Sequence, residues 1–311
     1  GQTLVCPPVP LGDERIEDGS RTILTCGKRY RELMEDPSGP TTPSSAGSDD
    51  PTYRARREAI AAAATGPHRR PGLVDYTDVE HGVWRTVSAA LAPLWQRYGA
   101  NQVLEARQRL GLPSDRLPQL DEVAVGLASL TGFRFRAVEG LVDKETFFDA
   151  LSREIFLSTQ YVRHEETPLY TPEPDVIHEV IGHANCLADP QLAELHRLAG
   201  RAMTRVETTE ARQFIADVFW FSGEFGVVLE GGEPRAYGAG LLSSFGELGW
   251  FAHHAELRPI DVWQMGRLPY DISRYQPVLF AAESLDHVLD EVGGFFARVS
   301  DADVAARLAA A

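Results

Sequence analysis

Two histidines five residues apart, His178 and His183, constrain the fold of this chain more than any other feature. They enclose a short, mostly apolar segment in the stretch TPEPDVIHEVIGH, which begins at Thr171. Two positions five apart on an α-helix diverge by about 140°, so both imidazoles reach one metal ion only if the helix ends between them. Because glycine adopts the left-handed conformation found at helix ends, we predict that a helix beginning after Pro174 breaks at Gly182.

The same spacing indicates which kind of metal site to expect. Zinc proteases carry two histidines four apart on one helix face, whereas these two are five apart. The motif therefore argues against a zinc hydrolase, which stays as the alternative from another class, and favours a different two-histidine site. Asp175 lies where a carboxylate stabilises the first helical turn and can orient a histidine.

Glu224 is the candidate third ligand. It lies three residues after Phe221 and four before Val228, so it borders the apolar stripe of a helix predicted over residues 210–228. A buried carboxylate costs free energy unless it is paired or binds a metal, although most helical glutamates are solvated. Two neutral imidazoles and one carboxylate leave three coordination positions open, the pattern of non-haem iron(II) oxygenases. The three residues therefore predict an iron(II) site.

Composition limits the class of protein. Hydrophobic residues make up 43% of the 311 residues, enough for a large core, and the net charge of −15 argues against nucleic acid as a partner. We see no apolar run of ~18 residues that could span a membrane and no secretory signal. The three cysteines are odd in number and far apart. We therefore expect a cytoplasmic protein that does not bind membranes.

The chain divides into two parts. Residues 1–52 read as an N-terminal extension whose Pro/Ser/Gly-rich end, 37–51, is a disordered linker. From residue 53 the pattern predicts a mainly α-helical fold with a few short β-strands. The expected helices cover residues 54–64, 78–98, 101–110, 120–130, 190–206, 210–228 and 284–299, and one more is entered through a turn over 140–148 and runs to about 156. The expected strands cover 133–138, 235–237 and 275–281.

Several motifs, in the same order along the chain, resemble those of the tetrahydropterin-dependent aromatic amino acid hydroxylases. They lie within residues 76–297 and read STQYVRH (158–164), YTPEPDVIHEVIGH (170–183), FWFSGEFG (219–226), AYGAGLLSSFGE (236–247), and QP with AES (276–277 and 282–284). The resemblance, strongest to the bacterial phenylalanine hydroxylases, implies the hydroxylase catalytic-domain fold over residues 53–311. It also implies an enzyme that hydroxylates a free aromatic amino acid with O2, a reduced pterin such as tetrahydrobiopterin, and iron(II).

The resemblance also implies roles for individual residues. His178, His183 and Glu224 match the iron ligands, and Glu179 matches a catalytic glutamate that lies near the pterin. The other residues that match pterin contacts are Phe147, Gly140, Leu141, Val142 and Ala216. Arg163 matches the arginine that pairs with the substrate carboxylate, a role suited to a guanidinium group. The remaining matches to the substrate site are Thr171, Ser243, Ser244, Trp220 and Phe225.

Some positions depart from the family pattern and leave the substrate and the ring position open. The four residues after His183 read Ala-Asn-Cys-Leu where Pro-Leu or similar is usual, and Ala281 is smaller than expected. A tryptophan at position 220 resembles the pattern of phenylalanine and tyrosine hydroxylases more than that of tryptophan hydroxylases. We therefore expect phenylalanine as substrate, with the para position favoured over the meta position. Two hypotheses are less favoured. One is an enzyme that hydroxylates tryptophan, and the other is a non-catalytic binding protein that has kept the fold.

The two ends of the chain also differ from the animal enzymes. The N-terminal segment does not resemble their regulatory domain, and no coiled-coil tail follows Ala297. We therefore expect an unregulated monomer.

Overall fold

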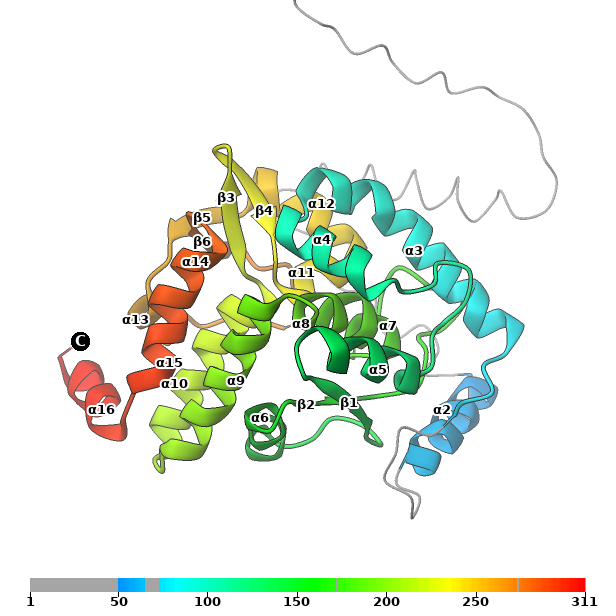
Figure 1. The fold of residues 1–311 in the computed structure, drawn as a ribbon, viewed down its shortest axis with the longest axis horizontal. Coiled ribbons are helices and arrows are strands. Elements are labelled where there is room, and N and C mark those ends of the chain that lie inside the picture. The colour runs from blue at the N-terminus through cyan, green and yellow to red at the C-terminus, as the bar shows by residue number, and fades with distance from the viewer. Residues whose placement is uncertain (1–49, 65–72, 172, 273, 311) are drawn as a thin grey trace, which may run out of the picture.

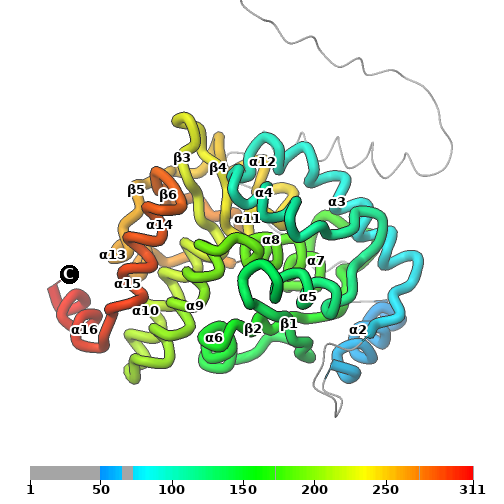
Figure 2. Tube along the Cα trace, viewed as in Figure 1, coloured from blue at the N-terminus to red at the C-terminus, as the bar shows by residue number. Residues whose placement is uncertain are grey.

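The structure, a computed structural model, describes residues 50–64, 73–171, 173–272 and 274–310. Residues 1–49 of the predicted N-terminal extension, with most of its linker, lie outside these residues, and a helix already begins at Pro51. Figures 1 and 2 show the described part as one helical body in which the strands are short. The predicted fold class, mainly α with a few short strands, is confirmed.

The helices, in chain order, are the following: α2 Pro51–Ala64, α3 Asp78–Tyr98, α4 Asn101–Leu110, α5 Leu120–Leu130, α6 Lys144–Ser152, α7 Val176–His178, α8 Asn185–Leu187, α9 Pro190–Arg205, α10 Thr209–Phe219, α11 Ala239–Ser243, α12 Phe245–His254, α13 Val262–Met265, α14 Leu285–Val288, α15 Gly294–Arg298 and α16 Asp301–Ala309. Three π-helical segments, η1 Glu179–Ala184, η2 Trp220–Glu224 and η3 Leu289–Gly293, continue α7, α10 and α14.

The first long helices form where local sequence signals agree. Helix α3 begins with a capping box, in which Thr77 and Glu80 satisfy each other's backbone N–H groups. Helix α4 ends at Gly111, whose φ of 66° is the left-handed conformation that glycine accepts readily. Apolar side chains at three- and four-residue spacing face the core between these signals. The predicted ranges 78–98, 101–110 and 120–130 match α3, α4 and α5.

The strands form two small sheets. Strand β1, Arg134–Ala137, pairs in parallel with β2, Ile155–Ser158. The other sheet has the order β4-β3-β6-β5, from β3 Val227–Glu230, β4 Glu233–Ala236, β5 Glu256–Pro259 and β6 Val278–Ala282. Helix α9 packs against α6 on one side and against α10 and α15 on the other (Figure 1).

Two predicted helices are too long. The helix expected to follow the turn over 140–148 and to run to about 156 ends at Ser152, because residues 155–158 pair with β1 instead. The helix expected over 210–228 ends at Glu224, and Val227 and Val228 belong to β3, where both side chains are buried. A buried strand and a buried helix face share the same apolar pattern, so periodicity alone does not separate them.

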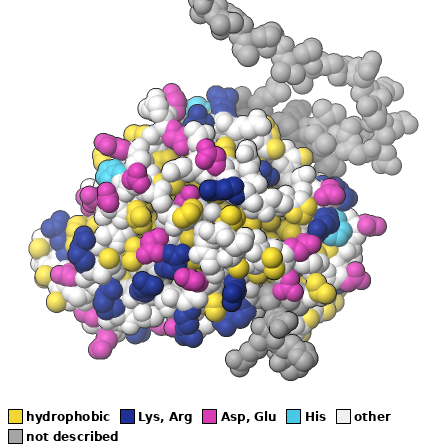
Figure 3. All heavy atoms as spheres, in the orientation of Figure 1, with side chains coloured by type: hydrophobic (Ala, Val, Ile, Leu, Met, Phe, Trp, Pro, Cys, Tyr) yellow, Lys and Arg dark blue, Asp and Glu magenta, His cyan; other side chains and the backbone are white. Residues whose placement is uncertain are grey.

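Both signs of charge occur on the surface. Figure 3 shows acidic and basic side chains interspersed over one face, with apolar side chains between them. Among the described residues, no helix is both long enough and apolar enough to span a bilayer.

Glu247 in α12 makes the stability of the fold depend on pH. The side chain is buried and accepts a hydrogen bond from the backbone N–H of Gln276 at 2.6 Å. Burial raises the pKa of Glu247 to about 8, so the folded state holds a proton that the unfolded state releases above its ordinary pKa of 4.5. The free energy of unfolding should therefore fall as pH rises from about 4.5 to about 8, by at most about 1.4 kcal/mol per pH unit for this one group.

Urea unfolding at several pH values tests this prediction. Glu247→Gln keeps an acceptor for Gln276 and cannot ionise, so its stability should change less than that of the wild type across the same window. Equal slopes for both proteins would contradict the prediction.

Candidate active site

A π-helix brings His178 and His183 to the same side of the chain. Helix α7 continues through η1 into α8, and the residues at both ends of η1, His178 and Asn185, keep right-handed helical dihedrals. Hydrogen bonds from residue i to i+5 widen the turn, so residues five apart diverge much less than they would on an α-helix. The predicted helix break at Gly182 is wrong, because this glycine is not among those with positive φ. The expectation that both histidines serve one site is kept.

Gly182 has a packing role instead. A Cβ atom at this position would lie 2.6 Å from the carbonyl oxygen of Ala239. Glycine therefore lets η1 lie directly against α11, the helix that carries Ser243. This close approach places the Ser243 hydroxyl beside the first histidine.

Asp175 fixes the start of the histidine segment. Its Oδ1 accepts a hydrogen bond from the backbone N–H of His178 at 3.0 Å, which caps α7. The same carboxylate accepts hydrogen bonds from Nε and Nη2 of Arg163 at 3.0 and 2.7 Å, and both side chains are buried. Burial opposes ionisation of Asp175, but the Arg163 charge and the hydrogen bonds outweigh it and lower its pKa. Asp175 thus orients the His178 backbone, while a different residue holds the imidazole.

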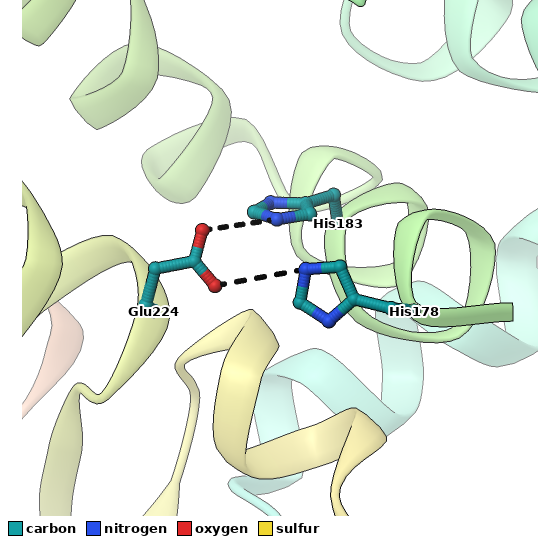
Figure 4. A group of neighbouring side chains, drawn as sticks. All are labelled: His178, His183 and Glu224. Carbon is teal, nitrogen blue, oxygen red and sulfur yellow. Dashed lines mark ion pairs between the residues drawn. The ribbon is translucent and has the colours of Figure 1, made fainter. Parts of the chain in front are cut away.

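Glu224 lies opposite the two rings, at the end of η2 (Figure 4). Its Oε1 is 3.0 Å from Nε2 of His183, and its Oε2 is 3.9 Å from Nε2 of His178. The three potential ligand atoms all lie within 4.8 Å of one another. Two imidazole nitrogens and one carboxylate at this separation fit a divalent metal ion with open positions.

Charges and hydrogen bonds set the protonation of these groups. Burial and the neighbouring His183 lower the pKa of His178 to about 4, so its imidazole is neutral. The hydroxyl of Ser243 bonds to the Ala239 carbonyl at 2.8 Å and lies 2.8 Å from Nδ1 of His178. Since the hydroxyl donates to the carbonyl, it accepts from Nδ1–H, which leaves the Nε2 lone pair free toward Glu224.

His183 and Glu224 shift each other's pKa. Burial disfavours both charged forms, but the Glu224 carboxylate raises the pKa of His183. Against the same effect of burial, the histidines hold the pKa of Glu224 at about 2. The carboxylate is therefore anionic near neutral pH, as a metal ligand must be.

One pocket joins the metal-binding group to most of the predicted pterin residues. Its wall contains Gly140, Leu141, Val142, Phe147 and Glu179 together with His178, His183 and Glu224. Ala216, the other predicted pterin residue, is half-buried on α10 and is not part of this wall. Burial raises the pKa of Glu179 to about 8, whereas the pKa of Glu224 in the same pocket is about 2.

Sequence reasoning missed several side chains of the same wall, among them Phe156, Lys144 and Thr159. The ring of Phe156 lies on His183, with centroids 4.4 Å apart. Lys144 begins α6 at the rim, and the buried hydroxyl of Thr159 has no partner among the described residues. The sequence pattern places Phe156 in a helix that does not extend so far, and its actual position depends on the pairing of β2 with β1.

The predicted aromatic residues of the substrate site lie together. Trp220 begins η2 and packs against Phe225, with ring centroids 4.8 Å apart. It also stacks on Tyr270, with ring centroids 4.5 Å apart and nearly parallel planes. Tyr270 is an aromatic neighbour that the sequence motifs did not include.

The predicted polar residues of the substrate site are more dispersed. The Ser243 hydroxyl is hydrogen-bonded to His178, and Ser244 caps α12. The Thr171 hydroxyl donates to the Glu173 carbonyl at 2.6 Å. Asp175 occupies the Nε–Nη2 edge of Arg163, and Nη1 donates a hydrogen bond to the Pro168 carbonyl at 3.4 Å. Arg163 is therefore buried and already paired, and it does not line the pocket that contains the metal-binding group.

Comparison with known proteins places these observations in a family. The family model of biopterin-dependent aromatic amino acid hydroxylases matches residues 33–304. The chain is 46% identical over 261 residues to phenylalanine 3-hydroxylase of Streptomyces coeruleorubidus, an alignment that covers 83% of this chain and 93% of that protein. It is 37% identical over 260 residues to phenylalanine-4-hydroxylase of Bos taurus, covering 81% of this chain but only 57% of the longer bovine protein.

A solved structure agrees. The phenylalanine hydroxylase of Chromobacterium violaceum, with bound iron(III) and the oxidised cofactor 7,8-dihydrobiopterin, superposes with a TM-score of 0.71 at 25% identity, covering 83% of this chain and 92% of that one. The expected catalytic-domain fold is thereby confirmed. From the match over most of its length, the chain belongs to the biopterin-dependent aromatic amino acid hydroxylase family.

Proposed function

We propose that this protein hydroxylates the ring of free L-phenylalanine at an iron(II) ion held by His178, His183 and Glu224, with O2 and a tetrahydropterin. The observation that carries the proposal is the shared pocket, whose wall contains all three ligands together with Phe147 and Glu179. Iron(II), when bound, would supply together with the reduced pterin the redox chemistry that activates O2.

The protein side chains would position these reactants. Phe147 offers a half-buried ring in the pocket wall for stacking of the pterin. Phe156 covers the face of His183 and keeps water from that side of the ligand. Ser243 holds the His178 tautomer whose Nε2 can bind the metal. A zinc hydrolase is disfavoured, because nothing in such a reaction requires the pterin residues to share the ligand pocket.

Arg163 and the aromatic group would bind the amino acid. Arg163 is buried, but Asp175 takes only its Nε–Nη2 edge and holds the fork rigid. The Nη1–Nη2 edge, whose other bond is the long one to the Pro168 carbonyl, would pair with the substrate carboxylate. Trp220, Phe225 and Tyr270, whose rings pack together, would offer an aromatic surface for the substrate ring.

The position hydroxylated is proposed to be the meta carbon. The sequence motifs favour the para position, but the similarity to a 3-hydroxylase over nearly its whole length supports the meta position instead. The departure after His183 supports the same choice. Asn185 bonds through its amide nitrogen to the Ile181 carbonyl, and Cys186 bonds to the Tyr237 carbonyl, so side chains anchor this segment where the family pattern has Pro-Leu.

A product assay tests this proposal. Iron(II)-loaded protein is incubated with phenylalanine, tetrahydrobiopterin and O2, and the products are separated against meta- and para-tyrosine standards. We expect meta-tyrosine as the main product. Para-tyrosine would reverse the proposed position, turnover of tryptophan alone would reverse the substrate, and no hydroxylation by a protein that retains zinc would favour a hydrolase.

The other expectations stay predictions. They are the cytoplasmic location, the monomeric state, the absence of nucleic acid and membrane partners, and a catalytic domain over residues 53–311.

A further inference from the structure

Two buried histidine nitrogens near the metal-binding group have no hydrogen-bond partner among the described residues. They are Nδ1 of His183 and Nε2 of His196. The two side chains belong to residues only 2% and 1% exposed. Buried polar atoms are almost always hydrogen-bonded in folded proteins, so both nitrogens require a partner.

The two nitrogens have complementary character. Nδ1 of His196 lies 2.7 Å from the Leu192 carbonyl oxygen, which can only accept, so the proton of His196 is on Nδ1 and the lone pair on Nε2. Nε2 of His183 faces Glu224, and in metal binding it gives its lone pair, so its proton is on Nδ1. One unpartnered atom is therefore a donor and the other an acceptor.

The side chains packed around these two nitrogens are mostly apolar. The two ring centroids are 6.3 Å apart with nearly perpendicular planes. Phe156 lies against His183, and Phe133 and Phe219 lie against His196, so the neighbouring rings are mostly apolar. The rings are thus neighbours, yet their two unpartnered nitrogens make no direct hydrogen bond to each other. One buried water molecule, which needs at least two polar partners, would satisfy both atoms.

We propose that His196 is a positioning residue for the metal site. Its Nε2 accepts, through one buried water, the hydrogen bond of His183 Nδ1–H and so holds Nε2 of His183 toward the metal. This inference rests on the proposed metal site. Histidine ligands generally donate their second N–H to an acceptor that fixes the tautomer, and Ser243 already serves His178 in that way.

Cobalt(II) binding to the metal-free protein tests the inference. His196→Phe keeps a ring of similar size but removes the acceptor, and should weaken Co(II) binding by about 10- to 100-fold. His196→Gln keeps an acceptor oxygen and should restore most of the affinity. Thermal unfolding of the metal-free variants separates loss of the site from loss of the fold.

His254 provides the matched control. Its Nδ1 also bonds to the carbonyl four residues earlier, at 3.0 Å, and its ring stacks on Trp250 away from the metal-binding group. His254→Phe should therefore leave Co(II) affinity unchanged. Wild-type affinity in His196→Phe would overturn the inference alone, whereas a wild-type protein that binds no Co(II) would overturn the proposed metal site and the inference with it.

A measurement on the wild-type protein covers the case in which His196→Phe does not fold. Nitrogen-15 NMR of histidine-labelled, zinc-loaded protein should show His196 protonated on Nδ1 only, and a slowly exchanging proton on Nδ1 of His183. A proton on Nε2 of His196 would overturn the inference, because that nitrogen would then be a donor.

Discussion

Replacing Glu224 by alanine should abolish hydroxylation and weaken metal binding by more than about 100-fold, since losing even an outer hydrogen-bond partner of a ligand costs 10- to 100-fold. Glu224 is the single anion among the three ligand side chains. Its removal leaves two imidazoles, of which His178 is neutral, to hold a divalent cation in a buried site. The loss includes both a coordinate bond and the charge that offsets the metal ion.

Co(II) titration and the product assay measure the two effects. Glu233→Ala is the control, because Glu233 is an exposed carboxylate on β4 and should tolerate the change. Co(II) affinity within threefold of wild type in Glu224→Ala would show that another group completes the site. Glu179, in the same pocket wall, would then be the first residue to test.

The parts of the fold that were predictable have local causes. Helices α3, α4 and α5 match their predicted ranges, because apolar spacing, caps and glycines all give the same answer within one segment. The clustering of the candidate ligands was predictable for a related reason. Two histidines five apart are unusual enough to specify a site even when the reason for their convergence was misjudged.

The parts that were missed depend on contacts far apart in the chain. Nothing in the segment 179–184 signals a π-helix, and the need for Gly182 arises from Ala239, more than fifty positions later. Strands β2 and β3 form because partners exist for them. Phe156 and His196 beside His183, and Tyr270 beside Trp220, owe their positions to this packing and belong to no sequence motif.

Asp175→Asn should lower the free energy of unfolding by about 3–5 kcal/mol, the range found when one partner of a buried ion pair is removed. Arg163 and Asp175 are 5% and 0% exposed, so the guanidinium would be left without an anion in the interior. Asparagine still offers an oxygen to the backbone N–H of His178, which isolates the charge from the cap. The pKa of Asp175 is lowered in the folded state, so its contribution is present above its ordinary pKa of 3.8 and is lost as pH falls through the folded value.

Urea unfolding of the metal-free proteins at neutral pH measures this loss without a contribution from metal binding. Glu173→Gln is the matched control, because Glu173 pairs with Arg57 in the same segment but is exposed, and exposed pairs contribute about 0–1 kcal/mol. The double variant Arg163→Met with Asp175→Asn should recover part of the stability, since it removes the unpaired charge as well. If Asp175→Asn lost no more than Glu173→Gln, the guanidinium would have found another anion or water, and the buried pair could not be what holds Arg163 and His178 in place.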